Sequence, residues 1–262
     1  MQDLNRYVAI AEEFPNDPSE KIKSGGLLHD RRVSRIVTPG TLIDENFMDP
    51  FSNNYVLAIH VGDSLGDGGS LTDPEMLIGL AWLDLSTGHF FTQATTLSAL
   101  PSFLARIGPK EVILSEELQE EKNHGIFTVL EEDHYLVSYI DTTVAQPISE
   151  WTANLESPIP PGIIDEFTPE EVAAGSSLLQ YVATRLQGSN IKLQPPTRQS
   201  DVMGIDKNTM RALEIRTTMR EDSVSGSLLN IIRRTVTKGG TRLLGSWLSK
   251  FVLYYLPATD LC

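Results

Sequence analysis

Hydrophobic and polar positions follow a β pattern in the middle of this chain, and the pattern predicts an α/β unit there. Near-continuous apolar runs at 55–61 and 77–85 are typical of strands that are buried on both faces of a sheet. A third strand is predicted at 89–93 and a fourth at 111–115. Between these two, residues 98–107 place apolar side chains at helical spacing and are followed by a Gly-Pro stop. The order strand, strand, strand, helix, strand indicates an α/β fold.

The first 45 residues carry a weaker β pattern. Short β-type runs at 7–11 and 33–37 are separated by a polar connection that contains glycine. Two strands joined by a long loop cannot bury a core by themselves. We therefore expect this region to be the end of a domain whose other strands lie outside the chain.

From residue 168 onward the apolar spacing is helical. Thr168 is followed by proline and, at the third helical position, by Glu171, which predicts a capping box at a helix start. Further helices are predicted at about 206–220 and around 228–232. A last helix is predicted to carry a broad apolar face formed by Leu243, Leu244, Trp247, Leu248 and Phe251.

Charge is distributed unevenly along the chain, whose formal net charge is −14. Residues 51–165 carry 3 basic and 17 acidic side chains, whereas residues 166–262 carry 12 basic and 9 acidic ones. An acidic surface repels the phosphate backbone of nucleic acids, so any DNA contact is expected from the flanks. The one cysteine, Cys262, excludes an internal disulfide framework and fits a reducing intracellular compartment. No apolar run reaches the roughly 20 residues that span a bilayer.

The one glycine-rich loop, 62–70, does not match a phosphate-binding loop. The pattern G-x-x-x-x-G-K-[ST] needs a lysine that reaches the β and γ phosphates, and no lysine occurs between Lys23 and Lys110. Asp63 and Asp67 would also repel phosphate. The loop is therefore interpreted as a hairpin connection rather than a nucleotide site.

Acidic residues near strand ends raise the question of nuclease chemistry. Asp63 and Asp84 lie at or near the ends of adjacent predicted strands, where ribonuclease H-like nucleases hold carboxylates for two-metal catalysis. Glu116, Glu117 and Asp141 are the residues that could complete such a site. The alternative, which we favour, is that Asp84 caps the tight Asp-Leu-Ser-Thr-Gly turn through its side chain. The five histidines are scattered singly, without metal-ligand spacing, so no metal site is predicted.

Basic residues gather towards the two ends of the chain. Arg31, Arg32 and Arg35 flank the second short β run. Six more arginines lie in the helical end: Arg211, Arg216, Arg220, Arg233, Arg234 and Arg242. A charge run on helices is most often a solvated face.

Three collinear segments resemble signature runs of the MutS family of DNA mismatch-repair proteins. The first is Arg32-Val-Ser-Arg-Ile-Val-Thr-Pro-Gly-Thr-Leu-Ile-Asp44, and the second is Gly79-Leu-Ala-Trp-Leu-Asp-Leu-Ser-Thr-Gly88. The third begins at Met203-Gly-Ile-Asp206 and is followed by Gly240-Thr-Arg-Leu-Leu-Gly-Ser-Trp-Leu248. Three matches in family order are far more specific than any one of them.

The resemblance implies three regions. Residues 1–48 would be the C-terminal end of the mismatch-recognition domain, and 49–166 a connector domain with a ribonuclease H-like fold, non-catalytic in this family. Residues 167–262 would be the all-α start of the core or lever domain. The proline-rich stretch 156–166 is the predicted linker between the last two.

The resemblance also implies a function. Complete proteins of this family bind mismatched duplex DNA as dimers, couple it to a C-terminal ATPase that uses ATP and Mg²⁺, and recruit a MutL-type partner. This chain shows neither the Phe-x-Glu element that wedges beside a mispair nor a P-loop. We therefore expect a fragment that is not itself an enzyme, with no catalytic residue, cofactor or metal and no membrane contact.

Two details of the resemblance concern location and DNA. In this family the recognition domain contacts DNA, so Arg31, Arg32 and Arg35 are candidate phosphate contacts. The resemblance is to a eukaryotic, fungal mitochondrial type, which implies an intracellular protein of the nucleus or mitochondrion.

Two other functions are open at this point. A ribonuclease H-like nuclease predicts metal-dependent cleavage that Asp84→Asn abolishes. A protein-interaction module predicts partner binding through the acidic α/β unit without DNA affinity. If the chain is a fragment of a MutS-type protein, residues 50–165 are expected to fold independently, and both flanks are expected to expose apolar faces.

Overall fold

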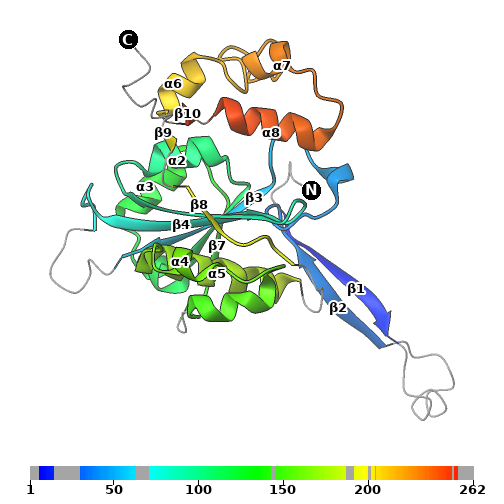
Figure 1. Cartoon of the computed structure of the whole chain (residues 1–262), viewed down its shortest axis with the longest axis vertical. Coiled ribbons are helices and arrows are strands. Elements are labelled where there is room, and N and C mark those ends of the chain that lie inside the picture. Colours follow the sequence, from blue (N-terminus) through cyan, green and yellow to red (C-terminus); the bar gives the residue numbers. More distant parts are fainter. Residues whose placement is uncertain are drawn as a thin grey trace.

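A six-stranded mixed sheet with helices on both faces forms the body of the protein, in a computed structural model (Figure 1). A two-stranded hairpin projects from this body, and a small helical end lies over one of its helical layers. The structure describes residues 6–14, 30–62, 71–142, 146–186, 192–199, 202–203, 205–249 and 251–252. Asp63 and Asp67 of the glycine-rich loop, and Cys262, lie outside the described residues.

The sheet contains the four strands expected from the sequence and two further strands that the sequence pattern did not predict. Its strands in chain order are β3 (Tyr55–Val61), β4 (Leu77–Asp84), β5 (His89–Thr96), β6 (Glu111–Ser115), β7 (Val137–Ile140) and β8 (Thr197–Arg198). Their spatial order is β7-β6-β3-β4-β5-β8. β3, β4 and β5 form an antiparallel meander, whereas β6 is parallel to β3, β7 to β6 and β8 to β5. This arrangement is the one expected of a ribonuclease H-like α/β unit.

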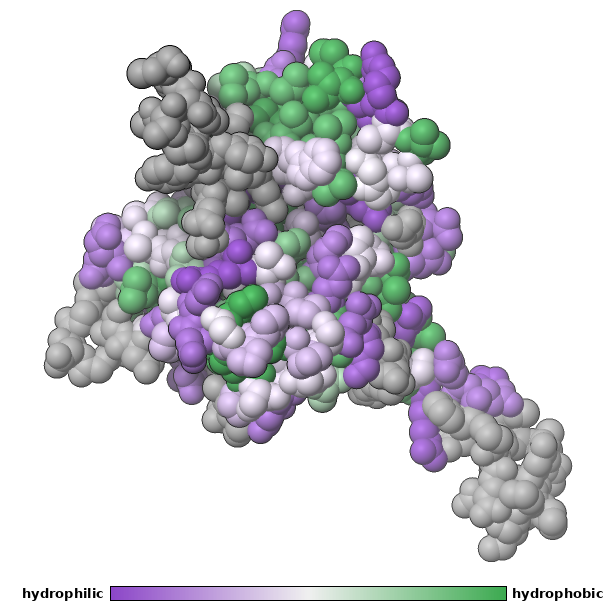
Figure 2. All heavy atoms as spheres, viewed as in Figure 1, coloured by the Kyte–Doolittle hydropathy of each residue, from purple (hydrophilic) through white to green (hydrophobic). Residues whose placement is uncertain are grey.

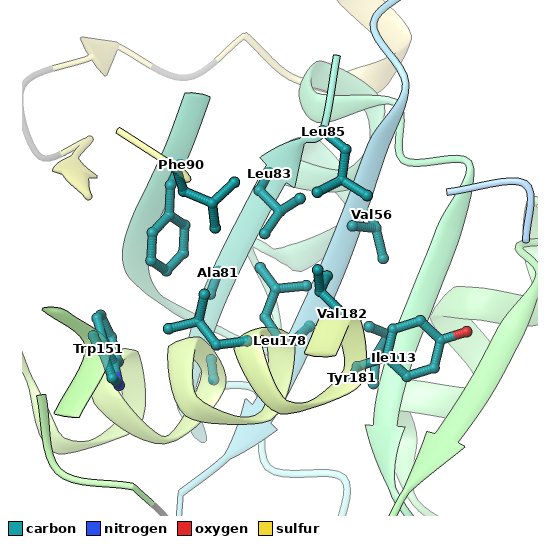
Figure 3. Close-up of a cluster of buried hydrophobic side chains, with 14 of the residues drawn as sticks. Val56, Ala81, Leu83, Leu85, Phe90, Ile113, Trp151, Leu178, Tyr181 and Val182 are labelled. Atoms are coloured by element: carbon teal, nitrogen blue, oxygen red, sulfur yellow. The ribbon is translucent and has the colours of Figure 1, made fainter. Parts of the chain in front are cut away.

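Alternate residues of the central strands face different helical layers, because successive side chains of a strand point to opposite faces. Leu57 and Trp82 face one cluster, which includes residues of α2 (Leu100–Ile107) and α3 (Gly125–Glu132). Val56 and Leu83 face the other cluster, which is covered by α5 (Pro169–Arg185) (Figure 3). Both faces are therefore buried, as the continuous apolar runs predicted.

Trp151 anchors the layer that contains α5. It lies in the 3₁₀ helix η5 (Ile148–Asn154), is fully buried, and donates from Nε1 to Ser176 Oγ at 3.3 Å. Its ring packs against Phe90, with ring centroids 5.6 Å apart (Figure 3). A Cβ at Gly175 would lie 2.2 Å from the Trp151 ring, so only glycine allows this approach.

The stretch 156–166 is not a linker, and the helix after it does not open a separate helical domain. Ile159 and Phe167 are buried in the same cluster as α5, and a short helix, α4 (Pro161–Ile164), lies between them. The predicted capping box of α5 is present, but the helix packs on β3 and β4. Helical periodicity shows that a helix has an apolar stripe, but it does not show what packs against that stripe. The sequence pattern therefore assigned this helix to the helical end instead of the α/β unit.

The helical end begins after β8 and is built from short pieces. These are α6 (Lys207–Ala212), α7 (Leu228–Ile232) and α8 (Lys238–Leu248), with a two-stranded ladder of β9 (Val202–Met203) and β10 (Phe251–Val252). The helix expected at 206–220 ends early, and Glu214 adopts a left-handed conformation with φ of 48°. Such a backbone conformation is incompatible with a continuing right-handed helix.

Part of the apolar face of α8 points outward, while Leu248 packs against the buried cluster of Ile205, Met210 and Ile215. Leu243 and Trp247 are 49% and 64% exposed, whereas Thr241, Arg242 and Gly245 are buried on the opposite side. Hydrophobic side chains gather over this end of the molecule (Figure 2). The expectation that the C-terminal flank exposes apolar side chains is confirmed.

The hairpin consists of β1 (Val8–Phe14) and β2 (Asp30–Val37), which pair with each other in antiparallel register. Among the described residues they form a separate two-stranded sheet, which projects away from the body (Figure 1). The two predicted strands are therefore present, and within the described ranges no further strand joins them. Two further 3₁₀ helices in the described part of the chain are η2 (Glu45–Phe47) and η4 (Glu116–Glu120).

Candidate functional site

Asp84, the strongest candidate for nuclease chemistry, is a structural cap. Its side chain is buried; Oδ1 accepts from Ser86 N at 2.9 Å and Ser86 Oγ at 2.6 Å. Oδ2 accepts from Asn54 N at 3.2 Å. The carboxylate thus closes the β4–β5 turn and ties it to the residue before β3. The favoured alternative, a turn cap, is confirmed.

The other acidic candidates do not assemble around Asp84. Glu116 and Glu117 lie in the first turn of η4, and Asp141 follows β7; all three are exposed. In the described part of the chain, no three His, Cys, Asp or Glu side chains lie close enough together to hold a metal ion. The geometry therefore does not favour a metal-dependent nuclease.

One histidine, His124, has a clear role in local structure. His124 is buried and is the N-cap of α3, where its Nδ1 accepts from Ile126 N at 3.1 Å. Burial lowers the pKa of His124, an effect that the nearby Glu121 carboxylate opposes. A neutral ring fits this role, because an imidazolium has no free acceptor nitrogen.

The three arginines of the hairpin lie on β2 opposite β1. Arg31 is paired in register with Glu13 and Arg32 with Glu12, whereas Arg35 is paired with Ile10. Arg31 Nη2 lies 3.9 Å from Glu13 Oε2, and both side chains are well exposed. Exposed pairs of this kind contribute little to stability and are readily exchanged for another anion. Arg35 has no acidic residue directly opposite it.

Two arginines of the helical end are not part of a solvated face. Arg242 is buried on α8, and Arg216 lies at the junction with the α/β unit. Arg216 donates from Nε to Ser249 Oγ at 3.0 Å and from Nη2 to the Arg106 carbonyl at 3.2 Å. Burial lowers the pKa of Arg216, and Tyr55 opposes this shift. These contacts join α2, the chain after α6 and the end of α8.

The Arg106 carbonyl belongs to the last turn of α2, where carbonyl groups have no partner within the helix. The side chain of Arg106 is buried, donates from Nη2 to Gln93 Oε1 at 2.7 Å, and lies over the Phe103 ring at 4.6 Å. Burial lowers the pKa of Arg106 to about 10, so the guanidinium stays charged at neutral pH. Arg216 thus supplies a charged donor to the electronegative end of α2.

An open groove of about 400 Å³ runs beside this junction. Its lining residues are Ala105, Met210, Arg211, Arg216, Thr217 and Asp222. The interface between the helical end and α2 is therefore incompletely packed, and polar contacts help to hold the two parts together.

Replacing Arg216 with alanine should loosen the helical end without unfolding the sheet. The change removes two charged hydrogen bonds, which contribute roughly 1.5 to 3 kcal/mol each. Chymotrypsin, which cleaves after aromatic side chains, should then cut at the exposed Trp247 faster than in the unaltered chain. Arg220→Ala is the matched control, because Arg220 is an exposed arginine of the same segment. Equal cleavage rates in both variants would contradict this role for Arg216.

Several important positions were not singled out from the sequence. Glu111 and Arg106 are charged residues that are almost completely buried, and Tyr181 is a buried member of α5. Glu111 stands directly before the apolar run Val112-Ile-Leu114 of a central strand, a position that gives no indication of its distant partners.

No helix within the described ranges is long and apolar enough to cross a membrane.

Comparisons with known proteins match both parts of this structure. The family model of MutS domain II matches residues 54–194, and that of MutS domain III matches residues 208–250. The DNA mismatch repair protein MutS of Wolbachia pipientis wMel is 32% identical over 255 residues, covering 94% of this chain and 28% of that protein. The MutS protein of Rhodopseudomonas palustris (strain HaA2) is 30% identical, covering 98% of this chain and 27% of that protein. The chain thus spans little more than a quarter of the length of these relatives.

Proposed function

We propose that this chain, which belongs to the MutS family of DNA mismatch repair proteins, connects a mismatch-recognition region to the helical core of such a protein. This proposal rests on one observation: the two family matches fall, in chain order, on two structurally distinct parts of the protein. Residues 54–194 are the α/β unit and residues 208–250 the helical end. The hairpin precedes both, at the position where the family has the end of its recognition domain.

For a complete protein of this kind we propose binding of mismatched duplex DNA as a dimer, coupling to ATP and Mg²⁺, and recruitment of a MutL-type partner. The names of the relatives, all DNA mismatch repair protein MutS, support this proposal. For the chain itself we propose no ATPase activity, no bound cofactor and no membrane contact. The glycine-rich loop lies between Lys23 and Lys110, where no lysine occurs that could reach a nucleotide phosphate. This supports the absence of ATPase activity and of a bound nucleotide cofactor.

We propose that DNA contact, where it occurs in this chain, comes from the hairpin through Arg31, Arg32 and Arg35. The acidic α/β unit would repel phosphate, and the weak Arg31–Glu13 pair can open to receive it. Arg35 should contribute most, because no carboxylate stands directly opposite it.

Binding of the chain to fluorescent duplexes with and without one mispair should test this function. We expect weak, salt-sensitive binding with less than about a tenfold preference for the mispair, roughly 1.4 kcal/mol. Changing Arg31, Arg32 and Arg35 together to alanine should weaken binding and reduce the salt dependence by about one unit per lost phosphate contact.

The matched control is a second triple variant, with three exposed arginines of the helical end changed to alanine: Arg211, Arg220 and Arg234. It removes the same charge and should retain more of the affinity, and ATP should leave all affinities unchanged. A mispair preference well above tenfold, a response to ATP, or equal losses in the two triple variants would each count against the proposal.

We further propose a eukaryotic, fungal mitochondrial type of MutS protein that acts in the nucleus or mitochondrion. The resemblance noted in the sequence supports this assignment. A fluorescent fusion of the gene product, imaged in its own cells, is expected to coincide with a DNA stain in one of these compartments and not with the surrounding cytosol.

A further inference from the structure

Glu111 is a buried carboxylate at the base of the hairpin. Its side chain is fully shielded from solvent, a costly position for a charge unless hydrogen bonds replace the lost water. Oε2 accepts from Thr38 Oγ1 and from Gly40 N, the latter at 3.1 Å. Oε1 accepts from Ser138 Oγ and from Tyr181 OH, each at 2.5 Å. Four donors therefore satisfy the two oxygens.

The four donors come from four places in the fold. Thr38 and Gly40 form the turn that follows β2, Ser138 lies on β7, and Tyr181 lies on α5. Glu111 itself begins β6. One carboxylate thus joins the end of the hairpin to two strands of the sheet and to the helix that covers it.

Glycine is required in the turn for this approach. A Cβ at Gly40 would lie 2.9 Å from Glu111 Cβ, from Glu111 Oε2 and from Val56 Cβ. The Thr38-Pro-Gly-Thr41 run, which carried part of the family resemblance, is therefore a turn shaped to hold this carboxylate.

The first strand of the hairpin is fastened to the same network. Tyr7, directly before β1, places its OH 2.6 Å from Ser138 Oγ. The Ser138 hydroxyl has one proton, which it donates to Glu111, so Tyr7 must donate to Ser138. The Arg185 guanidinium lies 5.9 Å from the Tyr7 ring and 4.8 Å from the Tyr181 ring, which adds cation–π contacts on the same side.

The charge of Glu111 sets the direction of these hydrogen bonds. Thr38 donates its hydroxyl proton to Glu111, so Thr41 must donate to Thr38 Oγ1 in their 2.9 Å contact. Burial and the neighbouring Glu111 charge raise the pKa of Tyr181, which keeps its hydroxyl a donor. A neutral amide in place of the carboxylate would turn one acceptor into a donor and set it against existing donors.

We infer that Glu111 is a positioning residue whose buried carboxylate fixes the direction in which the β1–β2 hairpin leaves the α/β unit. Both strands are held at their base, β2 through Thr38 and Gly40 and β1 through Tyr7. Among the described residues the hairpin has no other strand to pair with. The hydrogen bonds of this joint therefore act together with the apolar contacts of Ile10 and Val37 on Leu42 and Met48 to set its orientation.

Spin-label distance measurements on the full chain test the joint directly. Labels at Glu12→Cys on β1 and Glu131→Cys on α3, both exposed positions, report the hairpin's direction relative to the sheet. The single native cysteine is removed by Cys262→Ser. With Glu111 in place, we expect one narrow distance distribution.

Tyr7→Phe and Glu111→Gln should each broaden that distribution. Tyr7→Phe removes one hydroxyl from a half-exposed ring and should leave the chain folded, so it decides the question even where Glu111→Gln does not fold. Tyr139→Phe is the matched control, because Tyr139 lies next to Ser138 on β7 but faces the cluster on the other side of the sheet. An unchanged distribution in Tyr7→Phe, or equal broadening in Tyr139→Phe, overturns the inference.

Amide hydrogen exchange provides a second readout. In Tyr7→Phe the amides of β1 and β2 should exchange about tenfold faster, as expected for loss of one hydrogen bond that holds a locally opening unit. The amides of β3 and β4 should change by less than about twofold, because the sheet keeps its core. Exchange that rises equally in the hairpin and the sheet would show a general loss of stability and would overturn the inference.

Discussion

Replacing Gly79 with alanine should lower the free energy of unfolding by about 3 kcal/mol or more, because the added methyl group has no space. A Cβ at Gly79 would lie 2.0 Å from the carbonyl oxygen of Glu170 and 2.8 Å from Glu171 N. These are backbone atoms of the first turn of α5, so no side chain can rotate away. The helix itself would have to move off β4.

The first turn of α5 has little freedom to move. Thr168 and Glu171 form its capping box, with Thr168 N donating to Glu171 Oε2 at 2.9 Å. The same buried carboxylate accepts from Arg198 Nε of β8 at 3.2 Å. A shift of the helix would therefore disturb its own cap and the ion pair that ties it to the edge of the sheet.

Chemical denaturation measures this effect, with Gly162→Ala as the matched control. Gly162 lies in α4, and a Cβ there would meet no atom within 4 Å, so its free energy of unfolding should change by less than about 1 kcal/mol. If the two alanine variants unfold at the same denaturant concentration, the close contact between β4 and α5 is not present in solution.

The strands of the α/β unit could be predicted from the sequence because their signal is local. Runs such as 55–61 and 77–85 are short and near-continuously apolar, and that pattern is typical of a strand buried on both faces. The position of α5 could not be predicted in the same way. Its stripe of Leu178 and Val182 would suit a helix bundle as well as a sheet, and only the tertiary structure decides between them.

The same distinction separates Asp84 from Glu111. Asp84 hydrogen-bonds Ser86, two residues later, so turn chemistry alone predicted its role. Glu111 binds Thr38, 73 residues earlier, and Tyr181, 70 residues later. No local pattern records such contacts, and a glutamate at the start of a strand is normally read as a solvated end.

The domain boundary predicted from hydrophobic periodicity, near residue 165, therefore lies before the true end of the α/β unit. The piece 50–165, expected to fold alone, lacks α5 and would leave Val56, Ala81 and Leu83 uncovered on one face of the sheet. Residues up to about 199 complete this face and add β8 to its edge.

Replacing Asp84 with alanine should destabilise the protein by roughly 2 to 5 kcal/mol, because one buried and one partly buried backbone N–H group lose their acceptor. These are Asn54 N and Ser86 N. Asp84→Asn should cost less, since its carbonyl oxygen can still accept from Ser86, but its NH₂ group would then face the Asn54 N–H. Asp73→Ala is the control, because Asp73 also accepts from the backbone two residues later, at 3.0 Å, but on an exposed turn.

The same variants separate a turn cap from a catalytic carboxylate. If Asp84 is a cap, the free energy of unfolding should be lowest for the alanine variant, intermediate for the asparagine variant and highest for the unaltered chain. None of the three should cleave a labelled duplex when Mg²⁺ or Mn²⁺ is added. A nuclease requires the opposite result, in which the unaltered chain cleaves with metal and Asp84→Asn abolishes cleavage while unfolding stays the same. The geometry favours the first outcome, because both oxygens of the buried carboxylate are already occupied by protein donors and so are turned away from any substrate.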